Sequence, residues 1–195
     1  MAQATETKTA TALADPAPLG LMGFATTTIV LSAANAGFTG IDAGGALGLA
    51  LAYGGLGQLL AGMWEFKNGN TFGGVAFSSY GAFWISFWIL FNAAGSAPKG
   101  TYDVAWYLLG WTIVTGILLI GTFRLNYGLV VVFALLFLTF LLLCIGAFSA
   151  SDSTNHIGGY VGIVTAIAAY YMALAGILKA VSGGKIALPV GPIGG

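Results

Sequence analysis

Uncharged, mainly apolar runs recur along this chain and are separated by short stretches that carry the charges. The six runs each contain 20 to 22 residues: Leu19–Phe38, Gly44–Met63, Gly74–Gly95, Val104–Phe123, Gly128–Phe148 and Ile157–Leu178. At a helical rise of about 1.5 Å per residue, each run spans the roughly 30 Å hydrocarbon core of a bilayer. A helix also satisfies its own backbone polar groups without water. The pattern therefore predicts an all-α membrane protein with six transmembrane helices.

The predicted membrane domain occupies most of the chain. The connections between the runs are short, the longest being Trp64–Gly73, and leave no room for a soluble domain. We assign residues 15–181 to a six-helix transmembrane domain, and we expect residues 1–14 to form a disordered N-terminal tail. Residues 182–195 contain repeated glycines and prolines and are expected to form a loose C-terminal tail. The first run exceeds the roughly 7–15 residues of a signal-peptide core, so we interpret it as a retained helix.

The positions of the basic residues predict the orientation in the membrane. One side of a six-helix bundle would hold both termini and five basic residues, namely Lys8, Lys67, Arg124, Lys179 and Lys185, and the other side would hold Lys99 alone. Because basic residues are enriched on the cytoplasmic side, we expect a multi-pass protein of the cell (inner or plasma) membrane with both termini in the cytoplasm.

Composition supports a membrane protein and excludes several classes of function. Of 195 residues, 58% are hydrophobic and only 6% are charged, against about 25% charged in soluble domains. Six basic and six acidic residues balance without a basic run, so nucleic acid is not expected as a partner. A single cysteine, Cys144, excludes an intramolecular disulfide. No phosphate-binding loop, zinc-binding helix or nucleophile elbow is present, so we expect no enzyme activity, no cofactor and no metal.

Small residues at four-residue spacing predict where helices pack. We expect three contact faces, made by Gly44, Gly48 and Ala52, by Gly54, Gln58 and Gly62, and by Gly158, Gly162 and Ala166. The fifth run is rich in Leu, Val and Phe and has few small residues. Much of that helix is therefore expected to face lipid or a neighbouring subunit.

Polar side chains within the runs are the candidates for function, since an unpaired amide or hydroxyl in hydrocarbon costs several kcal/mol. Gln58 lies near the centre of the second run, with Gly54 and Gly62 one turn away on either side. Two interpretations of Gln58 stay open: its amide forms an interhelical hydrogen bond, or it lines a pore. Hydroxyls at similar depth come from Thr26, Thr27, Thr28, Ser78, Ser79 and Tyr80. Each alone is most simply structural, because such hydroxyls often bond to their own helix, but together they could line a weakly polar path.

The predicted spans contain no Lys, Arg, Asp or Glu. Such spans lack the charge ladder of a pump, the acid pair of a sodium site and a basic ring for tight anion binding. A coupled proton would have to travel on the substrate or use Asp15 or Glu65, which border the spans. His156, in the polar stretch SDSTNH, is interpreted as a solvated loop residue.

Two stretches resemble a known family. The first is Asp15–Phe24, DPAPLGLMGF, whose signature residues are Asp15, Pro16, Ala17, Pro18, Leu19, Gly20 and Leu21. The second is Tyr53–Trp84, YGGLGQLLAGMWEFKNGNTFGGVAFSSYGAFW. Both are similar to motifs of the acetate uptake transporter family. The later half matches in length, in hydropathy and in the segment Gly121–Arg124.

The resemblance implies a fold and a function. It implies six helices around a pore in each protomer, a cyclic homohexamer in the lipid bilayer, and proton-linked uptake of acetate and related short carboxylates, with succinate as a further candidate. It also implies a hydrophobic constriction, in which the family's aromatic and tyrosine fall on Phe24 and Tyr80 and its leucine falls on Leu136 by counting from Gly121. Gln58, Thr27, Thr28 and Ser79 are the candidate substrate-binding residues.

One position departs from the family pattern, and two other functions stay open. Asp15 replaces the family's asparagine; an aspartate can still cap the helix, with Pro16 in its first turn, but it adds negative charge at the predicted cytoplasmic mouth. A channel-like passive anion pore is one alternative. A non-transporting membrane scaffold or sensor, whose polar residues merely lock the helices, is the other.

Overall fold

The computed structural model describes residues 13–38, 40–41, 44–92 and 102–193. Most of the predicted N-terminal tail, including Lys8, lies outside the described residues, as does Lys99.

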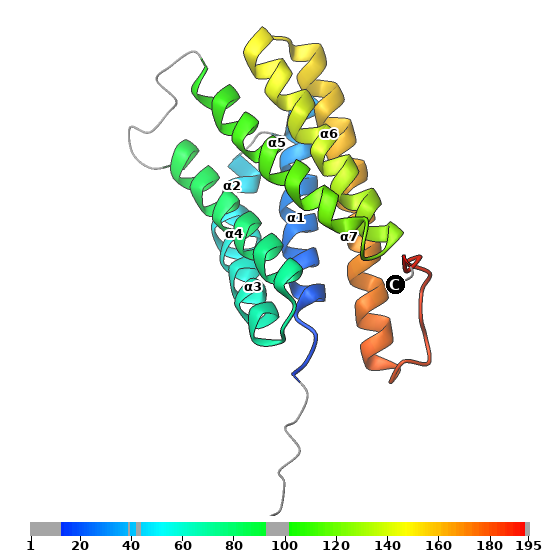
Figure 1. The fold of residues 1–195 in the computed structure, drawn as a ribbon. Coiled ribbons are helices and arrows are strands. Elements are labelled where there is room, and N and C mark those ends of the chain that lie inside the picture. The colour runs from blue at the N-terminus through cyan, green and yellow to red at the C-terminus, as the bar shows by residue number, and fades with distance from the viewer. Residues whose placement is uncertain (1–12, 39, 42–43, 93–101, 194–195) are drawn as a thin grey trace, which may run out of the picture.

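Six helical spans confirm the predicted all-α membrane architecture (Figure 1). Five are single helices: α1 (Ala17–Asn35), α4 (Thr71–Asn92), α5 (Asp103–Thr122), α6 (Tyr127–Ser149) and α7 (Asp152–Val181). The second span is continuous but composite, running through α2 (Gly44–Leu51), the π-helix η1 (Ala52–Gly57) and α3 (Gln58–Lys67). All six spans are long and apolar enough to cross a membrane.

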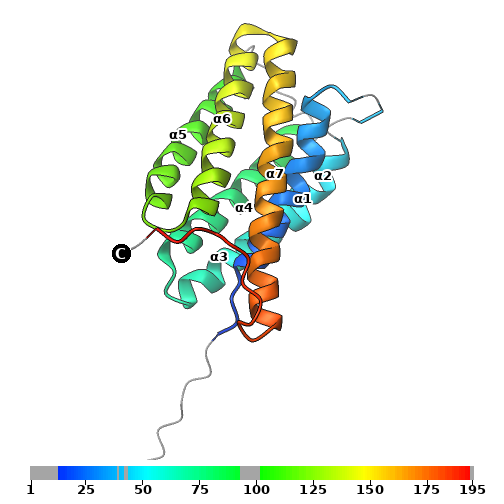
Figure 2. The same ribbon diagram turned by 90° about the vertical axis from the view of Figure 1, so that its right-hand side faces the viewer.

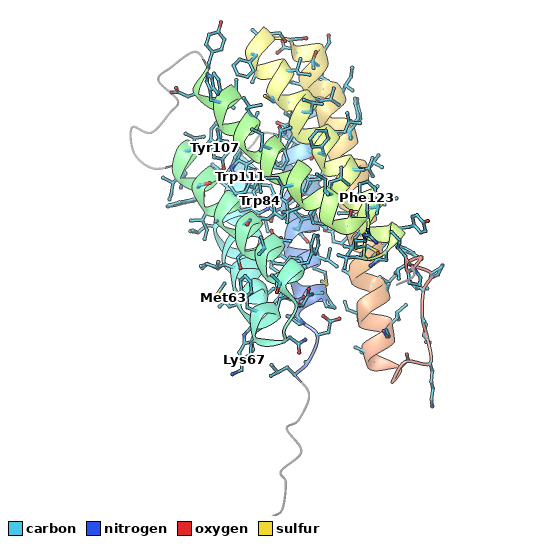
Figure 3. All side chains as sticks on the ribbon, viewed as in Figure 1. Met63, Lys67, Trp84, Tyr107, Trp111 and Phe123 are labelled. Atoms are coloured by element: carbon cyan, nitrogen blue, oxygen red, sulfur yellow. The ribbon has the colours of Figure 1, made fainter. Side chains whose placement is uncertain are left out.

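Helix α1 lies in the middle of the bundle. It packs against α7 on one side and against the α2–η1–α3 span on the other, while α6 packs between α5 and α7 (Figures 1 and 2). The segments before α1 and after α7 lie at the same end of the bundle (Figure 1), as an even number of spans requires. Lys67, at the end of α3, also lies there (Figure 3).

Two of the three predicted glycine faces are contact faces. Gly162 packs against Ser32 of α1, and Gly62 packs against Ser78 of α4 so closely that a side chain at either position would collide. The third set is not a contact face within this chain, because Gly44, Gly48 and Ala52 are exposed and an added Cβ at Gly48 would meet nothing within 4 Å. Small residues therefore permit close packing in this bundle but do not by themselves specify it.

Helix α5, and not α6, is the most exposed span. Only 22% of its most apolar stretch is buried, against 33% for α6. The reason is that α6 turns large side chains such as Phe133, Leu136 and Phe140 into the core. Much of α6 faces outward as expected, but α5 is more exposed still.

Helices α3 and α7 extend farthest beyond their predicted limits. Helix α3 continues to Lys67, so Glu65 lies inside a span, and it is buried with only 1% of its surface exposed. Asn68–Asn70, with Gly69 at φ +79°, then turns the chain into α4. Helix α7 begins at Asp152, where the Ser151 hydroxyl accepts a hydrogen bond from the Thr154 N–H at 3.3 Å. His156 is therefore helical rather than in a loop, although it is exposed as expected.

The C-terminal segment is docked, in contrast to the loose tail that its glycines and prolines predicted. The N–H groups of Tyr127 and Gly128 donate to the carbonyls of Gly191 and Val190 at 2.8 and 2.9 Å, and the Ile193 N–H donates to the Leu125 carbonyl at 3.1 Å. Residues 185–193 thus form a strap across the start of α6 (Figure 2).

Candidate functional site

Four of the predicted site residues line one small cavity. Phe24 of α1, Gln58 of α3, Tyr80 of α4 and Leu136 of α6 are all buried and face it. The other lining residues are Leu21, Ala76, Phe77, Val132 and Phe133. The cavity measures about 20 Å³, which is room for about one water molecule. A cavity of this size does not hold a solute as large as acetate.

The aromatic wall of the cavity is held in place from α5. Tyr80 stands 5.9 Å from Phe24, centroid to centroid, and its hydroxyl donates to the Thr115 hydroxyl at 3.1 Å. Thr115 in turn donates to the Trp111 carbonyl at 2.7 Å. Tyr107 and Trp111 lie on α5 beside this anchor (Figure 3), and the Trp111 ring stands 6.4 Å from the Tyr80 ring, centroid to centroid. Trp84 packs instead against Gly54 of η1. The Tyr80 ring therefore has a defined position at the cavity.

Gln58 is the most unusual polar group in the bundle. Only 1% of its surface is exposed, and neither Oε1 nor Nε2 has a hydrogen-bond partner among the residues that the structure describes. The π-helix η1 ends immediately before it, a feature frequent at functional sites. Gly23 of α1 approaches this turn so closely that an added Cβ would lie 2.6 Å from the Tyr53 carbonyl oxygen and 3.5 Å from Gln58 Cγ.

The three hydroxyl candidates do not join this cavity. The Thr27 hydroxyl donates to the Gly23 carbonyl of its own helix at 2.9 Å, the structural arrangement that its residue type favours. Thr28 lies one turn beyond Phe24 on α1, and its buried hydroxyl has no partner among the described residues. Ser79 is half-buried next to Tyr80 and lines none of the cavities described here.

A larger cavity of about 350 Å³ adjoins the constriction at the end that holds both chain ends. We call it the vestibule. It shares Leu21, Ala76, Phe77 and Phe133 with the small cavity. Its charged lining residues are Asp15, Glu65 and Lys179, and the strap contributes Ala187, Leu188 and Val190. The two cavities adjoin one another at the residues that they share.

The signature segment lines part of the vestibule. Asp15, Ala17, Pro18 and Leu21 line the vestibule, whereas Leu19 points outward. Pro16, and not Asp15 as expected, occupies the N-cap position of α1 and therefore lies before the first turn, and α1 has no side-chain cap. The Asp15 carboxylate still accepts a hydrogen bond from the Ala17 N–H at 2.9 Å. Gly20 packs against the Phe77 ring.

Glu65 is the main site residue that the predicted spans missed. Its Oε2 accepts a hydrogen bond from the Asn70 amide at 2.9 Å, and Asn70 Oδ1 accepts from the Gly73 N–H at 3.1 Å. Its Oε1 is buried without a hydrogen-bond partner among the described residues. The spacing between Gln58 and Glu65, seven residues, was the available signal, because it places both on one helical face. Phe133, three residues before Leu136, was missed although it lies on the same face.

Comparisons with known proteins identify the family of this chain. A family model described as the GPR1/FUN34/yaaH family matches residues 2–192. The chain belongs to this family. It is 38% identical over 185 residues to the succinate-acetate/proton symporter SatP of Escherichia coli, covering 93% of this chain and 97% of that protein. The resemblance noted in the sequence is confirmed.

A fungal relative and a solved structure extend the likeness. Acetate permease A of Emericella nidulans is 43% identical over 183 residues; the match covers 84% of this chain but spans only 61% of that protein. The structure titled "Structure of the bacterial acetate channel SatP" superposes with a TM-score of 0.85 at 37% identity, covering 92% of this chain and 99% of that one. These relatives are named for transport, and the chain has their membrane fold.

Proposed function

We propose that this protein moves acetate and related short carboxylates, including succinate, across the cell membrane. The observation that carries the proposal is the convergence of Phe24, Gln58, Tyr80 and Leu136, from four different helices, on one narrow cavity next to an open vestibule. The names of the relatives supply the substrate class.

The geometry supports selection by size and by the cost of dehydration. An apolar constriction this small requires a carboxylate to shed water before it passes, and the lining side chains must move apart to admit a two-carbon acid. The unpartnered amide of Gln58 replaces part of the lost hydration. Phe24, Tyr80 and Leu136 are the gate in this mechanism.

Three further features belong to the proposal. The protein assembles as a homohexamer in the bilayer, both termini lie in the cytoplasm, and uptake is linked to protons. The structure describes four of the basic residues predicted for the cytoplasmic side, namely Lys67, Arg124, Lys179 and Lys185. All four lie at or near the end of the bundle that holds both chain ends. The small cavity at the constriction favours a gated pathway over a permanently open pore.

Flux of radiolabelled acetate into proteoliposomes tests the function. Purified protein should accelerate uptake over protein-free liposomes, and an inwardly directed proton gradient should raise it further. Uptake that ignores the gradient would instead favour a passive anion pore. Uptake no faster than in empty liposomes, from protein shown to be folded, would leave a scaffold or sensor as the remaining interpretation.

A further inference from the structure

The vestibule contains a buried carboxyl group with an unused oxygen. Glu65 is 1% exposed; one of its oxygens is engaged by Asn70, and the other, Oε1, has no hydrogen-bond partner among the described residues. Glu65 is also one of the residues lining the vestibule. A buried acceptor of this kind is costly unless something donates to it.

The surroundings of Glu65 define what that donor is. The other charged groups lining the vestibule are Asp15, before α1, and Lys179, on α7, and both are exposed. From α4 comes the backbone of Gly73 and from the strap come only apolar side chains. A hard metal cation needs six or more oxygen ligands, and the described residues contain no cluster of three or more acidic, His or Cys side chains. A single O–H donor in a largely apolar cavity fits better.

We propose that Glu65 is the vestibule's binding group for a short carboxylic acid, with one proton shared between the Glu65 carboxyl and the carboxyl of the ligand. The inference rests on the proposed function and names its binding site. One ligand anion and one proton enter from solution, the proton lies between Glu65 Oε1 and a ligand oxygen, and no covalent bond other than that O–H changes. Two carboxyl groups this close cannot both be ionised.

The position of Glu65 connects this site to the constriction. Gln58 precedes it by seven residues on α3, which is two helical turns or about 10 Å along the axis, and the two side chains project from nearly the same face. The vestibule and the small cavity share Leu21 and Phe133. An acid bound at Glu65 therefore stands before the gate with its charge already neutralised, which lowers the cost of entering the apolar ring.

Proton uptake on ligand binding tests the inference. Saturation-transfer NMR with acetate gives the apparent affinity of the purified protein at a series of alkaline pH values, where both free carboxyl groups are ionised. For the unmodified protein we expect the affinity to fall about tenfold per pH unit, because one proton is bound with each ligand. Glu65→Gln keeps the oxygen that accepts from Asn70 and presents a fixed N–H donor, so its affinity should be independent of pH. Asp152→Asn, at the start of α7 and outside the vestibule lining, is the matched control and should retain the tenfold dependence.

The outcomes separate this inference from the proposed function. A Glu65→Gln variant that keeps the tenfold dependence would overturn the inference, because the proton would then travel on the substrate alone. Folded Glu65→Gln that no longer binds acetate, with Asp152→Asn binding normally, would support Glu65 as the binding group. Acetate flux in proteoliposomes by the unmodified protein decides the proposed function independently of either result.

A second measurement needs no change at Glu65. Infrared difference spectra with isotope-labelled acetate distinguish the ligand's carboxyl bands from those of the protein, and the Asp15→Asn background removes the other vestibule carboxyl. We expect acetate binding to change the unlabelled carboxyl bands, since Glu65 shares the proton. Unlabelled bands that stay the same while acetate is bound would contradict the inference.

Discussion

Replacing Gln58 by methionine should stabilise the protein and impair transport. Gln58 is buried, and neither of its two polar side-chain atoms has a hydrogen-bond partner among the described residues. An unsatisfied buried polar group costs about 1–3 kcal/mol. Methionine has a similar length and no strong polar group, so removing two such atoms should raise the free energy of unfolding by about 2 kcal/mol or more.

Thermal unfolding in mild detergent, followed by intrinsic tryptophan fluorescence, measures the first half of this prediction. For a chain of this size a 2 kcal/mol gain corresponds to a rise of roughly 4–8 °C in the unfolding midpoint. Acetate uptake into proteoliposomes, at equal amounts of folded protein, measures the second half. Uptake should fall at least severalfold, because the carboxylate loses the amide that replaces its hydration.

A matched control distinguishes a functional amide from ordinary packing. The Thr165 hydroxyl is equally buried but satisfied, donating to the Val161 carbonyl at 2.8 Å and lying 3.2 Å from the Thr139 hydroxyl. Thr165→Val should therefore lower the unfolding midpoint and leave uptake per folded molecule unchanged. If Gln58→Met destabilises the protein as Thr165→Val does, the amide is satisfied structurally and the reasoning is refuted.

The remaining predictions concern packing, the strap and assembly. Gly23→Ala should cost about 1–3 kcal/mol, because its Cβ would meet the Tyr53 carbonyl, whereas Gly48→Ala should change the unfolding midpoint little; equal midpoints would contradict the close approach at Gly23. Deleting residues 186–195 removes one wall of the vestibule, so acetate uptake should change while the folded yield stays normal, and unaltered uptake would exclude the strap from the path. Native mass spectrometry in mild detergent should show a hexamer, and only monomers would contradict this. A tag after residue 195 should be unreachable from outside intact cells; labelling there would reverse the proposed orientation.

The six membrane spans could be predicted from the sequence, because a span is a run of residues without charges and such runs can be read directly along the chain. The six uncharged runs locate the six spans within a few residues, and one exception is instructive. Glu65 was placed outside the second span because a charged residue in a helix is costly in lipid, yet α3 continues past it. Its carboxyl is supported by Asn70 in the following turn, a contact that only the folded chain shows.

Part of the candidate site was predictable, because the sequence resembles a known family. Phe24, Tyr80 and Leu136 come from segments far apart in the sequence, so hydropathy could not join them; the resemblance to a family did. The docked strap was not foreseen, because a segment rich in Gly and Pro has little structure of its own. Its position depends on tertiary hydrogen bonds, such as the one that the Tyr171 hydroxyl donates to the Pro189 carbonyl at 2.8 Å.

The selectivity of the constriction is tested most directly by comparing two leucines of α6. Leu136 faces the small cavity and is 3% exposed, whereas Leu138, two residues later, faces outward and is 41% exposed. Uptake of succinate and acetate into proteoliposomes should be measured in parallel for Leu136→Ala and Leu138→Ala, at equal folded protein. The account predicts that the succinate-to-acetate ratio rises severalfold in Leu136→Ala and stays unchanged in Leu138→Ala. A ratio that is the same in both variants as in the unmodified protein would contradict the gate at this position.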